Sequence, residues 1–351
     1  MTIGSRPPRS VMRCAASSSI GLGHLMRCYA LAQVLERMSH SVTSVVPYDD
    51  IAGFRKGPRF WHSRSIDPDI LCGVDVVIVD TYEIQEHDRR LIELTDALVV
   101  LKANSDTPQL RANLNVEPGI NCAWTPLDGQ AGVARSKGPE AVLLRSEVRK
   151  LGSALQTEES GLKTSGLRHQ LRVGRIFGGS GDSVYVMSLL RALAACGLPS
   201  IVRVAHHLIV DTHVEESALQ TEWNQPGNQA LETLANLDAV VSAAGVTAWE
   251  GLFLGIPLAL VEVVSNQGSN CSYMTSRHLA VGLGRLNLGE PVSVENLGGF
   301  LADHELRTNQ ARGGRSSIDG YGAESAAAMI EYLAISDRCA ARPKFKGGVA
   351  R

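Results

Sequence analysis

The chain has 351 residues, of which 44% are hydrophobic, and its 34 basic side chains nearly balance 36 acidic ones. This length and apolar share suit two globular domains, and the charge balance excludes the broad basic surface of a non-specific nucleic-acid binder. The seven scattered cysteines form no Cys-x-x-Cys pair, which argues against a disulfide framework or zinc site and fits a reducing cytoplasm. No apolar run reaches the ~18 residues of a membrane-spanning helix, so we expect no membrane insertion.

The first unit along the chain is a strand, a glycine turn and a helix. Residues 10–15 predict a short strand, and the apolar spacing over residues 24–38 predicts a helix. Between them, Gly21 and Gly23 let backbone N–H groups approach a ligand at the start of the helix, where negative charge is favoured. His24 follows directly, and a histidine there titrates near neutral pH and can move a proton. The alternative is a packed residue of the first helical turn.

The rest of the chain alternates between short apolar strands and helices of about 10–15 residues, the pattern of βαβ units with parallel sheets. The expected strands span residues 41–46, 74–80, 97–102, 171–177, 201–205, 239–242 and 258–264. The expected helices span residues 85–95, 184–195, 229–235, 247–254, 270–279, 294–303 and 323–335.

Residues 151–169 are small, polar and glycine-spaced, and predict a linker. The expected fold is therefore α/β, with two Rossmann-like doubly wound parallel-sheet domains at residues 1–150 and 170–335, followed by a basic tail at 336–351. Ligands of open α/β sheets bind beyond the carboxyl ends of the strands, where the glycine turns of this chain lie. We expect a site in a cleft between the two domains.

Two turns in the second half predict contact with phosphate. Gly178, Gly179 and Ser180 follow a strand and expose several N–H donors. They lack the Lys-Ser/Thr of a P-loop, which argues against ATP hydrolysis; the alternative is a simple tight turn. At the second turn Gly245 permits close approach of a ligand, and Thr247 is expected to cap the next helix and touch phosphate.

Further polar side chains lie near strand ends. Glu250 lies one helical turn beyond the second of these turns, where a carboxylate can accept both ribose hydroxyls; the alternative is a solvated helix residue. Asn266 and Gln267 follow a buried strand and offer paired amides to hydroxyl or N-acetyl groups, or form an ordinary turn. Asp80 and Tyr82 end the most apolar strand of the first half, where they can also simply cap and pack.

Together these signals resemble the PseG family of UDP-sugar hydrolases, over roughly residues 12–290. The second half alone is also similar to MurG-type glycosyltransferases, which share the two-domain GT-B architecture. The blocks that carry the resemblance are, in order, Arg13…Ser17…Ile20-Gly-x-Gly-His24-x-Met-Arg27, Val79-Asp80-x-Tyr82, Leu143-Leu144-Arg145, Phe177-Gly178-Gly179-Ser180, Ala244-Gly245-x-Thr247-x-Trp249-Glu250, Leu254-Gly255-x-Pro257 and Asn266-Gln267.

The resemblance implies a GT-B fold and hydrolysis of UDP-2,4-diacetamido-2,4,6-trideoxy-β-L-altropyranose at the anomeric carbon, without a metal or cofactor. It places His24 as the general base that activates water. The implied sugar-binding residues are Gly23, Arg27, Tyr82, Asn266 and Gln267. The implied nucleotide-binding residues are Gly178, Gly179, Ser180, Gly245, Thr247 and Glu250.

Two positions depart from the family pattern. Ala15 stands where the family usually has an aspartate, and Thr81 stands where it has a histidine. Both lie in the half that would bind the sugar, so two further readings stay open: a GT-B glycosyltransferase with a UDP-sugar donor, and a non-catalytic subunit that binds a nucleotide sugar. In each case the expected partner is a UDP-sugar, with no nucleic acid, in a cytoplasmic monomer or weak homo-oligomer.

Overall fold

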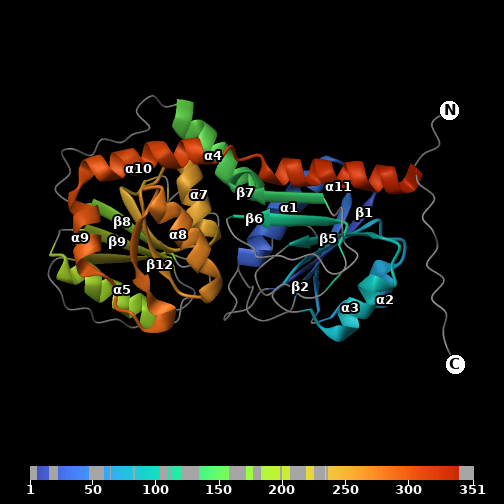
Figure 1. Ribbon diagram of the computed structural model, residues 1–351, viewed down its shortest axis with the longest axis horizontal. Helices are drawn as coiled ribbons and strands as arrows, with labels where there is room; N and C mark the ends of the chain where they lie inside the picture. Colours follow the sequence, from blue (N-terminus) through green and yellow to red (C-terminus); the bar gives the residue numbers. More distant parts are fainter. Residues whose placement is uncertain are drawn as a thin grey trace.

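The computed structural model describes residues 6–15, 23–46, 59–63, 65–81, 84–102, 110, 112–119, 134–157, 171–176, 183–197, 200–205, 219–224, 234 and 236–339. Four of the predicted site residues, Tyr82, Gly178, Gly179 and Ser180, lie outside these ranges. Within them the chain forms two parallel β-sheets flanked by helices, which appear as two lobes in Figure 1.

The first sheet has seven strands in the order β3-β2-β1-β4-β5-β6-β7, and its strand pairs are all parallel. Its strands are β1 (Arg9–Cys14), β2 (Ser41–Val46), β3 (Arg59–His62), β4 (Val76–Asp80), β5 (Leu98–Lys102), β6 (Leu114–Pro118) and β7 (Ala134–Gly138). The helices of this half are α1 (Gly23–Arg37), α2 (Pro68–Leu71), α3 (Glu86–Glu93) and the 3₁₀ turn η1 (Pro139–Ala141). Apolar clusters cover both faces of the sheet.

The second sheet has six parallel strands in the order β10-β9-β8-β11-β12-β13. They are β8 (Leu171–Ile176), β9 (Ser200–Ala205), β10 (Leu219–Asn224), β11 (Ala239–Ala243), β12 (Leu258–Glu262) and β13 (Val281–Arg285). Its helices are α5 (Ser183–Ala195), α7 (Val246–Leu254), α8 (Gly268–Ser276), α9 (Val294–Ala302) and α10 (His304–Ser317), with 3₁₀ turns η2 (Ser265–Gln267) and η3 (Leu286–Leu288).

The central strands form because their sequences suit burial on both faces. Every residue of β4, β11 and β12 is buried, as expected for apolar, β-branched runs inside parallel sheets. Helix α7 ends at Gly255, which adopts the left-handed conformation (φ 68°) that glycine tolerates best. The predicted strands at 74–80, 239–242 and 258–264 and the helix at 247–254 are thus confirmed.

Two helices pass between the halves. Helix α4 (Ser146–Thr157) follows the first sheet, yet Val148 packs into the second-half core. Helix α11 (Gly322–Cys339) follows the second-half helices, yet Ala326 and Ile330 pack into the first-half core. Figure 1 shows α10 along the second-half lobe and α11 along the first-half lobe.

These crossings correct two details of the predicted organisation, whose domain boundaries otherwise remain a prediction. The expected linker at 151–169 is wrong at its start, because α4 stays helical through Thr157. The helix expected at 323–335 does form, but it covers the first sheet, although the prediction assigned it to the second domain. Among the described residues, no helix is both long and apolar enough to cross a membrane.

Candidate active site

His24, which follows the first glycine turn, and Asp80, which ends a predicted strand, meet at one edge of the first sheet. Strands β1 and β4 are parallel neighbours, and their register places Cys14 beside Asp80. Carboxyl ends of parallel strands share one edge of a sheet. Helix α1, which follows β1, begins at Gly23, and its first turn therefore lies over Asp80.

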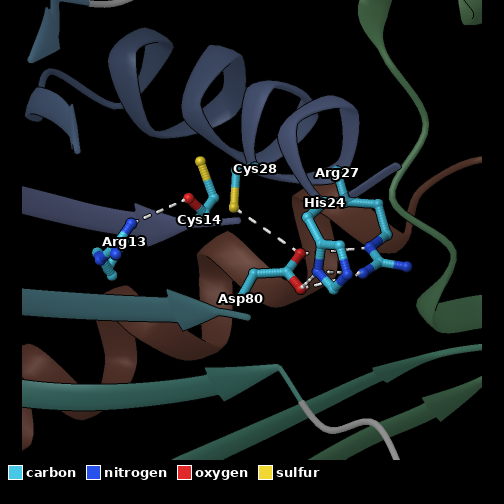
Figure 2. Close-up of polar contacts among 6 residues, drawn as sticks. All are labelled: Arg13, Cys14, His24, Arg27, Cys28 and Asp80. Carbon is cyan, nitrogen blue, oxygen red and sulfur yellow. Dashed lines mark hydrogen bonds and ion pairs between the residues drawn. The ribbon is translucent and has the colours of Figure 1, made fainter. Parts of the chain in front are cut away.

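His24, Arg27 and Asp80 form a compact, mostly buried cluster (Figure 2). The Nδ1 atom of His24 lies 2.5 Å from Oδ1 of Asp80. Arg27, three residues further along α1, donates to Oδ2 of the same carboxylate through Nε (3.3 Å) and to Oδ1 through a terminal nitrogen (3.0 Å). The Cys28 thiol lies 3.8 Å from Oδ2. Asp80 is completely buried, and His24, Arg27 and Cys28 from the first two turns of α1 are among the partners of its carboxylate.

The contacts of Nδ1 favour one tautomer of the His24 imidazole. Nδ1 of His24 lies between two groups: a terminal nitrogen of Arg27 at 3.0 Å, which can only donate, and Oδ1 of Asp80 at 2.5 Å, which can only accept when ionised. The shorter contact favours the tautomer with the hydrogen on Nδ1 and the lone pair on Nε2. The guanidinium of Arg27 balances the charge of Asp80, so the carboxylate does not need a protonated imidazole as its counter-ion. A neutral histidine with a fixed tautomer is the form that a general base requires.

Arg13, the first residue of the family-like pattern, faces away from this cluster. Side chains alternate between the faces of a strand, and Arg13 lies on the face of β1 opposite Cys14. Its Nε donates to Oδ2 of Asp88 on α3 at 2.8 Å, and Oδ1 of Asp88 accepts from the backbone of Ile66 at 2.7 Å. Ala15 is buried, and its N–H donates to the backbone oxygen of Asp80 at 2.9 Å. Arg13 thus braces α3.

In the second half, the first residues of α7 are partly exposed, but the expected cap is wrong. Gly245 is the N-cap residue, with no side-chain capping bond, and Thr247 is already the second residue of the helix. Its hydroxyl therefore has no capping geometry, because the cap position belongs to the residue before the first helical one. The N–H groups of Val246 and Thr247 have no acceptor within the helix, and they favour an anion.

The amide of Gln267 lies beside this helix start. Its Oε1 accepts from the backbone N–H of Val263 at 3.0 Å, and its Nε2 would be 3.9 Å from a methyl group placed on Gly245. Asn266 precedes it in η2 and is partly exposed. Asn270, at the start of α8, donates to the backbone oxygen of Ala244 at 3.4 Å. The donor nitrogen of Gln267 thus lies near the start of α7.

Glu250 is not a solvated helix residue, because only 4% of it is exposed. Nε and a terminal nitrogen of Arg145 both lie 2.9 Å from Oε1 of Glu250. Arg145 precedes α4, so the partner comes from the segment that crosses between the halves. The predicted ribose-binding carboxylate therefore has a buried arginine partner that the sequence analysis did not assign.

The two sides of the candidate site face each other. A methyl group placed on Gly23, the first residue of α1, would lie 3.7 Å from Cγ2 of Val246, the first residue of α7. One on Gly119, after β6, would lie 2.8 Å from Oδ1 of Asn270 and 3.3 Å from Nε1 of Trp249. The cluster around His24 thus lies next to the start of α7.

The structure therefore brings together most of the described predicted residues and adds two more. Gly23, His24 and Arg27 form one side, and Gly245, Thr247 and Gln267 form the other. The two added residues are Asp80 and Arg145, which the sequence analysis names without a role in the site; a carboxylate at the end of an otherwise apolar strand was the available signal for Asp80. Among the described residues, no group of three or more His, Cys, Asp or Glu side chains is placed to hold a metal ion.

Two parallel-sheet α/β halves joined in this way define the GT-B fold. Solved structures share it: MurG of Acinetobacter baumannii has a TM-score of 0.64 at 13% identity, covering 93% of this chain and 100% of that one. S. aureus MnaA, solved with UDP, has a TM-score of 0.62 at 9% identity, covering 93% and 96%. These identities show the fold alone.

A sequence relative matches only part of the chain. Over 132 residues the chain is 26% identical to the spore coat polysaccharide biosynthesis protein SpsG of Bacillus subtilis (strain 168). That match covers 36% of this chain and 38% of SpsG, so it spans well under half of either protein. No protein-family model matches the chain.

Proposed function

We propose that this protein is a GT-B glycosyltransferase that uses a UDP-sugar donor, with His24 as the general base that deprotonates the acceptor. The observation that carries this proposal is the approach of Gly23 to Val246, because it sets the His24–Asp80 pair beside the start of α7. A sugar nucleotide needs both features at the bond that breaks: a base for the incoming hydroxyl and N–H groups for the leaving diphosphate.

The comparisons supply the nucleotide in this proposal. MnaA shares the fold and was solved with UDP. MurG also shares the fold, over 93% of this chain, and the second half resembles MurG-type glycosyltransferases. In this assignment the N–H groups of Val246 and Thr247 and the Gln267 amide receive the diphosphate. Glu250 accepts from the ribose, and the sugar lies toward Arg27 and Asn266.

Hydrolysis of a UDP-sugar is the second candidate, with the diacetamido-trideoxyaltrose nucleotide of the PseG family as its specific substrate. The observation in its favour is the enclosure of the base, since only 2% of His24 is exposed. An enclosed base suits a small nucleophile such as water. The same Nε2 atom would then take a proton from water, whose oxygen would bond to the anomeric carbon as the bond from that carbon to the diphosphate oxygen breaks and UDP leaves.

One experiment separates the two reactions. The protein is incubated in ¹⁸O-labelled water with a panel of UDP-sugars, including the diacetamido-trideoxyaltrose nucleotide, with and without a mixture of sugar and polyol acceptors. UDP release that requires an acceptor, with the sugar found on that acceptor, is the expected result. Release without an acceptor, with ¹⁸O on the anomeric carbon, identifies the hydrolase. Tight UDP binding without release from any donor contradicts both reactions and identifies a binding subunit.

A further inference from the structure

The short segment Val142–Arg145 joins the two cores. Leu143 packs into the first-half core, while Val142 and Leu144 pack into the second-half core. The chain crosses back at Gly322, where an added methyl group would lie 2.4 Å from the backbone oxygen of Val142. The two crossing segments therefore lie in contact at Val142 and Gly322, and Arg145 is the last residue of the first segment. Its backbone is fixed from both sides.

Arg145 holds Glu250 in an asymmetric way. Its Nε and its terminal nitrogen both approach Oε1, each at 2.9 Å. Neither bond goes to Oε2, so the second oxygen of this carboxylate keeps its acceptor capacity. Both side chains are largely buried, at 10% and 6% exposure, so the carboxylate has little freedom to rotate.

The residues that follow Arg145 contact α1, the helix of the proposed base. Glu147, two residues on, accepts two bonds from the Gln33 amide of α1, at 3.0 and 3.1 Å, and one from the Tyr29 hydroxyl at 3.3 Å. Burial acts to raise the pKa of Glu147, but its hydrogen bonds and the nearby Arg145 charge hold that pKa below its ordinary value. Glu147 therefore stays ionised and keeps the start of α4 against α1.

A buried ion pair of this kind adds little net stability over apolar side chains of the same shape, whereas loss of one partner is costly. Its clearest physical effect is geometric, because it fixes where a charged group points. For Glu250 the direction matters, since ribose hydroxyls must reach an acceptor oxygen in a set orientation.

We propose that Arg145 is a positioning residue: it holds Glu250 through Oε1 and so presents Oε2 to the ribose hydroxyls of the nucleotide. This inference rests on the proposed function, in which the second half binds UDP. Arg145 itself touches no nucleotide in this account. Its effect on affinity therefore depends on the ribose hydroxyls being present.

The test compares UDP with 2′,3′-dideoxy-UDP by isothermal titration calorimetry. Arg145→Met should weaken UDP binding about 10- to 100-fold, the worth of one or two hydrogen bonds to a charged group, and leave the dideoxy Kd within about twofold. Arg145→Lys keeps the positive charge but cannot contact Oε1 through two nitrogens. It should weaken UDP binding less than Arg145→Met does and leave the dideoxy-UDP Kd unchanged. If Arg145→Met fails to fold, the lysine variant decides by the same comparison.

Arg149 provides the matched control, because it lies one turn along α4 and pairs with Glu324 of α11. Arg149→Met should change neither Kd. Equal losses for both nucleotides in the Arg145 variants would mean direct phosphate contact or general damage and would overturn the proposal, as would no loss at all. If the wild-type protein binds UDP no better than dideoxy-UDP, only the ribose role and this proposal fall. If it binds neither, the proposed function falls as well.

Discussion

Replacement of Asp80 by asparagine tests the proposed base while preserving the shape of the side chain. In the native protein the carboxylate lies 2.5 Å from Nδ1 of His24 and accepts two hydrogen bonds from Arg27. An amide keeps one acceptor oxygen, and its nitrogen can only donate. If that nitrogen faces His24, the imidazole must turn to the opposite tautomer, and Nε2 then carries the hydrogen. The group that should accept a proton has lost its lone pair.

The expected loss is that of a general base, about 10²- to 10⁴-fold in kcat, which equals roughly 2.7–5.5 kcal/mol of barrier. The UDP Kd should change less than about twofold, since Asp80 belongs to the opposite half from α7. Because Arg27 loses part of its counter-charge, we also expect about 1–3 kcal/mol lower stability. The assay measures kcat and KM for UDP release, UDP affinity by calorimetry, and unfolding by denaturant.

Asp88→Asn is the matched control. Asp88 is equally buried and also pairs with an arginine, but on the opposite face of the same sheet. Its loss should lower stability and leave kcat unchanged. His24→Asn should lose as much kcat as Asp80→Asn, and the double variant should lose little more, because the two residues act as one unit. A folded Asp80→Asn protein with kcat within about threefold of wild type would refute the reasoning, as would fully multiplicative losses in the double variant.

Three further outcomes are expected. Glu250→Ala should weaken UDP binding more than it lowers kcat, and an unchanged Kd would count against its ribose role. Gln267→Glu should raise the KM for the donor well above that of Gln267→Leu, because it sets a negative charge against the diphosphate; equal KM values would remove Gln267 from the phosphate side. Gly322→Ala should lower the free energy of unfolding by about 1–3 kcal/mol, because the added methyl group would meet backbone atoms of the first crossing. Gly299→Ala in α9, where nothing lies within 4 Å of an added methyl group, should raise it by about 0.5–1 kcal/mol. Urea denaturation measures both, and the opposite order would contradict the packing of the two crossings.

The sequence predicts the inner strands of both sheets well because their own residues determine them. Strand β4, with five buried residues, would be apolar in any context. Strands β7 and β10 have sequences rich in polar residues, ARSKG and LQTEWN, and lie at sheet edges. Their extended form comes from the neighbouring strand, a non-local partner that no local pattern shows. Helix α10 is missed because its sequence is polar and holds two glycines; the Asp303 side chain caps it, accepting from Leu306 N at 2.9 Å.

The candidate site divides in the same way. His24 and the glycine that opens α7 are found from the local order of strand, turn and helix. The Arg145–Glu250 pair joins residues 105 positions apart, so no spacing rule announces it. The wrong cap at Thr247 has a local cause: a glycine N-cap costs only a few tenths of a kcal/mol relative to a hydroxyl residue, so chain geometry at the strand end decides which residue takes the position.

In the proposed reaction, the first half would stabilise a positive charge and the second half a negative one. On the first side, a proton taken up by His24 places a positive charge on an imidazole whose Nδ1 lies 2.5 Å from the Asp80 carboxylate, the group that also pairs with Arg27. On the second side, helix α7 begins with a glycine cap and has no acidic residue in its first turn, a combination that favours an anion at its N–H groups. In the proposed reaction, the first half would receive the proton and the second half would stabilise the negative charge of the leaving diphosphate. The expected division follows: changes at His24 and Asp80 act on kcat, and changes at Gln267 and Glu250 act on nucleotide affinity.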